Sequence, residues 1–287
     1  NTIKKILLKA PILTQSGYGE QSRFALRSLR SREDLYDIYI LPIMWGTTSW
    51  SREDDEEKQW INEKIEKTIS YMQGGGTFDM SLQVTIPTEF EKIAPINIGY
   101  TAGIETTKMA PEWIEKINIM DKVLTISSHS KRVMENTEYE ARRMVNGVQG
   151  EPFIHKVNPN IIEYVNYPVK TFEELPDLEL NISTKFNFLC ASQFGTRKNI
   201  NNTIRWFVEE FREDENVGLI VKTNISKNCV MDKYATIGKI NETLSHLGEK
   251  KCHVYLLHGD MTDKEMHALY KHEKVNAFIS LAHGEGF

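Results

Sequence analysis

Apolar, strand-like runs alternate with helical runs along most of this 287-residue chain. KKILLKAPIL, residues 4–13, has the composition of a strand buried on both faces, and a helical run follows it. The alternation starts again at FNFLCAS, residues 186–192, and continues to NAFISLA, residues 276–282. Strands that alternate with helices predict parallel sheets covered by helices, which is an α/β fold.

Between about Pro159 and Lys185 the pattern of strands and helices weakens, and this stretch separates the two series. Residues 166–185 contain two prolines among polar side chains, a composition typical of a linker between domains. A chain of this length can hold two domains. We therefore predict an N-terminal domain at residues 1–168, a linker at 169–184 and a C-terminal domain at 185–287.

In the first domain, two predicted helices begin at residues that favour a helix N-terminus. Pro111 stands where a proline suits the first turn of a helix. Ser127 or Ser128 can cap the next helix, which the sequence pattern extends through residues 131–144.

Charge and cysteine content restrict the class of protein. The formal net charge is −5, from 35 basic and 40 acidic side chains, so we expect no nucleic-acid partner. Cys190, Cys229 and Cys252 form no CxxC and no disulfide framework, which favours a reducing compartment. Neither an apolar run of about 18 residues nor a signal peptide is recognisable. We expect a cytoplasmic protein without a transmembrane segment, and peripheral membrane contact stays open.

The chain ends in a carboxylate between two glycines. In AFISLAHGEGF, residues 277–287, Gly284 and Gly286 let the backbone approach a ligand closely. Glu285 follows a segment, residues 277–281, that we predict to be a buried interior strand, and open α/β sheets bind ligands at the carboxyl ends of such strands. A glycine-rich turn with one solvated glutamate is an equally good interpretation.

Two further segments have the chemistry of phosphate sites. SGYGEQS, residues 16–22, is a glycine-rich turn before a helix, which can direct backbone N–H groups at an anion; Ser22 breaks the dinucleotide fingerprint. FGTRKN, residues 194–199, places Arg197 and Lys198 between a strand and a helix, an arrangement that suits a diphosphate. A tight structural turn and a solvated basic turn are the respective alternatives.

LLHGD, residues 256–260, ends the next-to-last strand and can contact a nucleobase through its backbone and Leu257, unless it is a plain turn. The eight histidines include no pair with zinc-ligand spacing and no H-E-x-x-H. We therefore expect no metal and no cofactor.

These segments together resemble a known family. In the second domain a predicted strand is followed by Arg197-Lys198-Asn199 and a helix, and residues 283–287 are His-Gly-Glu-Gly-Phe. This order is similar to the donor half of retaining glycosyltransferases of the GT-B fold, family four. The early glycine loop and residues 100–133 resemble the acceptor-side half of such enzymes. The resemblance covers about residues 6–287 and is most specific at residues 197–199 and 283–287.

The resemblance implies two Rossmann-like domains facing a cleft and transfer of a sugar, of the hexosyltransferase type, with retained configuration. The donor would be a UDP- or GDP-linked sugar, and the acceptor a saccharide, a lipid-linked molecule or a protein. No metal ion is implied, because Arg197 and Lys198 would stabilise the leaving diphosphate.

The resemblance also implies roles for single residues. Glu285 matches the first glutamate of an E-x7-E motif and would act beside the transferred sugar. The second glutamate would follow Phe287, so the sequence looks cut within this motif. Glu105 is the nearest ionisable candidate where the family places an active-site histidine. The implied donor-binding residues are Gly17, Tyr18, Gly19, Arg197, Lys198, Leu257, His258, His283, Gly284, Gly286 and Phe287.

Two departures from the family keep other functions open. Ser192 and Gln193 stand where many relatives have a Gly-Arg pair, and residues 99–102 contain no histidine. The stretch without histidine and the missing second glutamate leave room for a protein that binds nucleotide sugars without catalysis. A nucleotide-sugar epimerase on the same fold is a further alternative.

Overall fold

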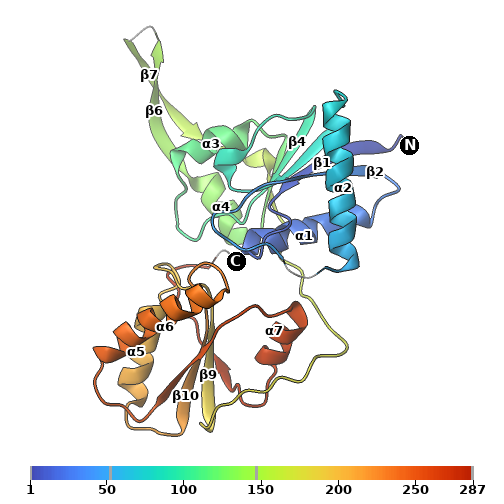
Figure 1. Ribbon diagram of the computed structural model, residues 1–287. Coiled ribbons are helices and arrows are strands. Elements are labelled where there is room, and N and C mark those ends of the chain that lie inside the picture. The colour runs from blue at the N-terminus through green and yellow to red at the C-terminus, as the bar shows by residue number, and fades with distance from the viewer. Residues whose placement is uncertain (1, 52–53, 146–147, 286–287) are drawn as a thin grey trace. The chain divides into compact units, whose positions relative to one another are not determined.

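The computed structural model describes residues 2–51, 54–145 and 148–285, and the chain divides into two compact units (Figure 1). We call the described residues up to Val169 unit 1 and Lys170–Glu285 unit 2. Each unit has its own parallel sheet with helices packed on it, as the alternation of strands and helices predicts. In the described part of the chain, no helix combines the length and apolar character needed to cross a bilayer.

Unit 1 is built on a six-stranded sheet with the order β2-β1-β3-β4-β5-β8, in which every neighbouring pair is parallel. β8 forms in the stretch where the sequence pattern weakens, because it completes the sheet beside β5. The strands are β1 (Lys4–Ala10), β2 (Tyr36–Pro42), β3 (Met80–Val84), β4 (Ile96–Tyr100), β5 (Lys122–Thr125) and β8 (Ile162–Tyr164).

Helices cover this sheet because its strands are apolar on both faces. Ile6 and Leu8 of β1 belong to one buried cluster with Leu26, whereas Leu7 belongs to another with Phe78. Because successive side chains of a strand point to opposite faces, the continuous apolar run of β1 contributes to the buried layers on both sides of the sheet. The helices are α1 (Gly17–Arg30), α2 (Glu56–Gln73), α3 (Pro111–Asn118) and α4 (Ser128–Asn136), with short 3-10 turns at Pro87–Glu89 and Pro159–Ile161.

The predicted helix through residues 131–144 is wrong in its second half. α4 ends at Asn136, and Glu138–Val145 (β6) pairs antiparallel with Val148–Lys156 (β7). This hairpin extends away from the rest of unit 1 (Figure 1). Thr137 and Tyr139 bind Met109 instead of continuing the helix: the Met109 N–H donates to Thr137 Oγ1 over 3.2 Å, and Tyr139 Oη donates to the Met109 carbonyl over 2.6 Å. Tertiary contacts therefore override the local helical pattern.

Unit 2 is built on a smaller parallel sheet with the order β11-β10-β9-β12. α5 and α6 lie side by side on one face, and α7 covers the other (Figure 1). The elements are β9 (Phe186–Ala191), α5 (Ile200–Phe211), β10 (Val217–Lys222), α6 (Val230–Ser245), β11 (His253–Leu257), α7 (Asp263–Tyr270) and β12 (Ala277–Phe278).

The last strand differs from its prediction. We expected residues 277–281 to form a buried interior strand, but β12 has two residues and Phe278 is 55% exposed. Among the described strands β12 pairs with β9 alone, so it is an edge strand. An edge strand has no second neighbour to pair with its outer N–H and C=O groups.

Candidate functional site

The four parallel strands of unit 2 end at one edge of the sheet, which we call the carboxyl edge of unit 2. Residues 194–199 follow β9, and residues 279–285 follow its neighbour β12. Lys198 Nζ forms an ion pair with Glu285 Oε2, and Arg197 Nη1 lies 4.0 Å from the same oxygen. The structure thus brings together the two most specific segments of the sequence.

Two hydrogen bonds to backbone carbonyls join these two loops. Arg197 Nη1 donates to the Gly284 carbonyl over 2.7 Å, and the His283 N–H donates to the Arg197 carbonyl over 2.8 Å. The guanidinium therefore holds the turn that presents Glu285.

Asn199 is a connecting residue whose role the sequence did not reveal. It has φ 56°, in the left-handed region that asparagine tolerates better than most residues. Its side chain is buried and donates to the Leu281 carbonyl over 3.0 Å. One residue thus starts α5 and ties it to the loop after β12.

The ion pair between Lys198 and Glu285 is accessible to solvent. The Glu285 side chain is 51% exposed and that of Lys198 is 21% exposed. Exposed ion pairs contribute little stability because water screens them. A diphosphate carries more negative charge than one carboxylate, so this arrangement can exchange Glu285 for a phosphate as the partner of Lys198.

A buried pair lies at the same edge, after β10 and β11. His258 Nε2 is 2.9 Å from Asp232 Oδ1, and the two side chains are only 3% and 6% exposed. The Asp232 carboxylate also accepts the backbone N–H groups of Ile225, Ser226 and Lys227, at 2.7–3.0 Å. Burial alone would raise the pKa of Asp232, but the bonds from His258 and these amides hold it well below its usual range.

Asp232 was missed by sequence reasoning, although an acidic residue in the first turn of a predicted helix is a usable signal. His258, which we predicted to bind the donor, directs its ring at Asp232 in this structure. Leu257 packs partly into the apolar cluster under α7. Their contact with a nucleobase stays a prediction.

The carboxyl edge of unit 1 is built from hydroxyl groups. Tyr18 Oη and Thr101 Oγ1 lie 2.9 Å apart, and the Ala102 N–H donates to Tyr18 Oη over 3.1 Å. The residues after β1 and β4 therefore meet across the end of β3, which separates the two strands. Burial raises the pKa of Tyr18, and the charge of Glu105 contributes in the same direction.

The glycine-rich segment has a different local structure from the predicted turn. α1 already begins at Gly17, because Ser16 Oγ caps it by accepting the Gly19 N–H over 2.9 Å. A Cβ on Gly19 would lie 2.0 Å from the Thr14 carbonyl oxygen, so close packing requires the glycine. Gly17, Tyr18 and Gly19 are thus the first turn of a helix.

The predicted site residues fall into two groups. Gly17, Tyr18, Gly19 and the exposed Glu105 lie at the carboxyl edge of unit 1. Gly286 and Phe287 lie outside the described residues. In the described ranges, no cluster of three or more His, Cys, Asp or Glu side chains could hold a metal ion. The residues at the carboxyl edge of unit 2 are Arg197, Lys198, Leu257, His258, His283, Gly284 and Glu285.

No protein-family model matches this chain, and no curated protein matches it by sequence. Solved structures do match. A mutant of the O-GlcNAc transferase of Thermobaculum terrenum superposes with a TM-score of 0.52 and 11% identity, over 99% of this chain and 49% of that one. The apo structure of OtsA gives a TM-score of 0.52 and 10% identity, over 99% of this chain and 79% of that one.

At such low identity the likeness shows the fold. It is the GT-B fold, α/β with two Rossmann-like units, which confirms the predicted fold class. The chain spans about half the length of the O-GlcNAc transferase that it matches.

Proposed function

We propose that this chain transfers a sugar from a nucleotide diphosphate donor to an acceptor hydroxyl. The observation that carries the proposal is the meeting of Arg197, Lys198 and Glu285 at the carboxyl edge of unit 2. The GT-B fold, shared with a transferase, supports it. When the glycosidic bond breaks, the diphosphate gains negative charge, and preorganised cations stabilise that charge.

Each of the three residues has a distinct proposed role. Arg197 offers a planar fork to phosphate oxygens, and Lys198 offers a compact charge. Lys198 is paired with Glu285 in this structure and exchanges it for the diphosphate when donor binds. Glu285, released beside the sugar, favours the positive charge that develops at the anomeric carbon.

The finer assignments belong to the same proposal. We propose a retaining hexosyltransferase of family four that uses a UDP- or GDP-linked sugar and acts in the cytoplasm. His283, Gly284 and the edge near Leu257 and His258 complete the donor side, and we also assign Gly17, Tyr18 and Gly19 to donor binding. Unit 1 otherwise provides the acceptor side, and the acceptor is a saccharide, a lipid-linked molecule or a protein. We keep the proposed domain boundaries at residues 1–168, 169–184 and 185–287.

Donor binding tests the phosphate assignment. Lys198→Ala and Arg197→Ala should each weaken the affinity for UDP or GDP about ten- to a hundredfold, since a charged hydrogen bond contributes about 1.5–3 kcal/mol. Isothermal titration calorimetry measures this. Lys185→Ala is the matched control, because Lys185 is exposed at the opposite end of β9. Equal affinity of all three variants and the wild type would refute the assignment.

Turnover tests the role of Glu285. Glu285→Gln keeps the shape of the side chain and removes its charge, so kcat should fall while donor affinity changes little. A kcat of Glu285→Gln equal to that of the wild type would exclude a catalytic role for Glu285. Release of nucleotide diphosphate without acceptor would indicate an epimerase, and donor binding without release or transfer would indicate a binding protein.

Chelation tests the proposal that no metal is needed. The two cations at residues 197 and 198 take the place that a metal ion has in other transferases, so activity of the intact protein should survive EDTA. Complete loss of activity that Mn²⁺ or Mg²⁺ restores would contradict this mechanism.

A further inference from the structure

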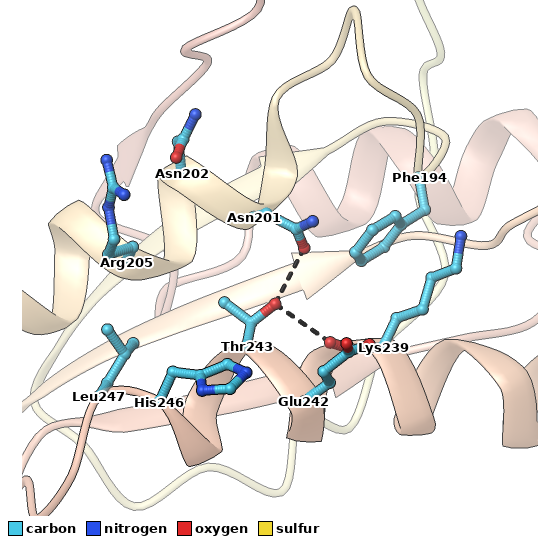
Figure 2. A pocket seen from close by; sticks show the side chains of 9 residues that line it. All are labelled: Phe194, Asn201, Asn202, Arg205, Lys239, Glu242, Thr243, His246 and Leu247. Carbon is cyan, nitrogen blue, oxygen red and sulfur yellow. Dashed lines mark hydrogen bonds between the residues drawn. The ribbon is translucent and has the colours of Figure 1, made fainter.

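A pocket of about 410 Å³ opens between α5 and α6 of unit 2 (Figure 2). Its volume falls in the range of small-molecule sites. Phe194, from the loop after β9, and Leu247, just after α6, lie at opposite ends of it (Figure 2). The remaining lining residues come from the two helices, with His246 just after α6, and are Asn201, Asn202, Arg205, Lys239, Glu242, Thr243 and His246.

The pocket is lined by hydrogen-bond donors, by acceptors and by charged side chains of both signs. Thr243 Oγ1 donates to Asn201 Oδ1 over 3.0 Å, so the two helices are joined at the pocket floor (Figure 2). The Lys239 ammonium lies 5.3 Å from the centre of the Phe194 ring. No side-chain hydrogen bond or ion pair with another described residue involves the Glu242 carboxylate. The pocket therefore offers donors and a strong acceptor to a ligand.

This mixture disfavours three ligand classes. An anion attracted by Lys239 would also meet the Glu242 carboxylate, and Arg205 is already 3.8 Å from Glu209. A metal ion would find Glu242 and His246, fewer than the three ligands that a protein site usually supplies. A wholly apolar molecule would remove these polar groups from water without replacing their hydrogen bonds.

We propose that this pocket binds a neutral saccharide unit. Each sugar hydroxyl both donates and accepts, so it matches the Asn201 amide together with the Glu242 carboxylate. The C–H groups of the ring can contact Phe194 and Leu247. Binding here does not require that the chain transfers sugar, and none of the residues assigned to the diphosphate lines this pocket.

The probes are glucose, galactose, N-acetylglucosamine and the homodisaccharides of each, tested by saturation-transfer NMR and then by titration of the best binder. We expect at least one to bind with a Kd on the order of 1 mM. Glu242→Ala and Asn201→Ala should each raise the Kd of the best-binding saccharide about three- to tenfold, since each removes one hydrogen-bonding group. Glu210→Ala is the matched control, because Glu210 is exposed on α5 and does not line the pocket.

Two additional measurements separate this pocket from the diphosphate site. Saccharide binding should persist in Lys198→Ala and in the presence of saturating UDP or GDP. Circular dichroism melting verifies that each variant is folded. Absence of saccharide binding, equal binding by Glu242→Ala and wild type, or displacement of the sugar by inorganic phosphate would each overturn the proposal.

Discussion

The carboxyl edges of the two sheets have similar positions in their units but different chemistry. In unit 1 the edge is held by neutral hydroxyl groups, with Tyr18 bonded to Thr101. In unit 2 it is held by charged groups: a buried pair, Asp232 with His258, and an exposed pair, Lys198 with Glu285. Arg197 and Lys198 give the second edge the positive charge that would stabilise a leaving diphosphate, which is why we place the diphosphate there.

The two charged pairs of unit 2 also differ from each other. The Lys198–Glu285 pair is accessible to solvent, so its partners can exchange at little cost. The Asp232–His258 pair is almost fully enclosed and has three backbone amides around it. Breaking a buried pair leaves its partner without compensation. We therefore interpret the buried pair as structural and the exposed pair as functional.

The largest expected effect comes from the buried pair. Asp232→Ala should lower the free energy of unfolding by about 3–5 kcal/mol, because His258 and three amide N–H groups lose their acceptor. Urea unfolding followed by circular dichroism measures it. Asp177→Ala, at an exposed site of the same unit, should change stability little. A cost below about 1 kcal/mol for Asp232→Ala would contradict a structural role.

The same carboxylate predicts an acid dependence. The pKa of Asp232 is lower in the folded than in the unfolded chain. Its contribution to stability is therefore fully present above the unfolded pKa of about 4 and is lost as pH falls toward the folded pKa. The stability of Asp232→Asn should decline less steeply than that of the wild type below about pH 4. Parallel declines in acid unfolding would show that Asp232 is not the group responsible.

In unit 1 the largest effect should come from packing instead of charge. Gly103 has φ 77°, and a Cβ there would lie 2.3 Å from Ser130 Oγ and 2.6 Å from Thr125 Oγ1. Gly75 has φ 78° and open space around it. Gly103→Ala should therefore lower the free energy of unfolding by about 1–3 kcal/mol more than Gly75→Ala does, because Gly75→Ala introduces backbone strain without a steric clash. Equal melting temperatures of the two variants would contradict the close packing.

The smallest effect should come from the neutral hydrogen bonds of unit 1. Tyr18→Phe removes the hydroxyl that is hydrogen-bonded to Thr101 and Ala102. It should lower the free energy of unfolding by about 0.5–1.5 kcal/mol. Tyr164→Phe, at a 44% exposed position, is the control and should be silent in thermal melting. A cost of Tyr18→Phe no larger than that of Tyr164→Phe would contradict the role of the Tyr18 hydroxyl in holding this edge.

Much of the local structure could be predicted because its causes lie within a few residues. The apolar run of β1 divides between two buried layers, Pro111 stands at the first position of α3, and Ser127 caps α4. The Ser16 cap acts at equally short range, yet the two glycines led us to predict a turn at residues 16–22. The error at residues 138–144 has a distant cause, since Met109 provides the partners of Thr137 and Tyr139.

The sequence by itself determined the α/β class and the chemistry of the candidate site, because hydrophobic period and side-chain type are local properties. It singled out Arg197, Lys198 and Glu285 without showing that they touch. Only the tertiary structure decided that β9 and β12 are neighbours, so that one carboxylate meets both cations, and that His258 faces Asp232. Strand order results from packing between distant parts of the chain, which no short window of sequence contains.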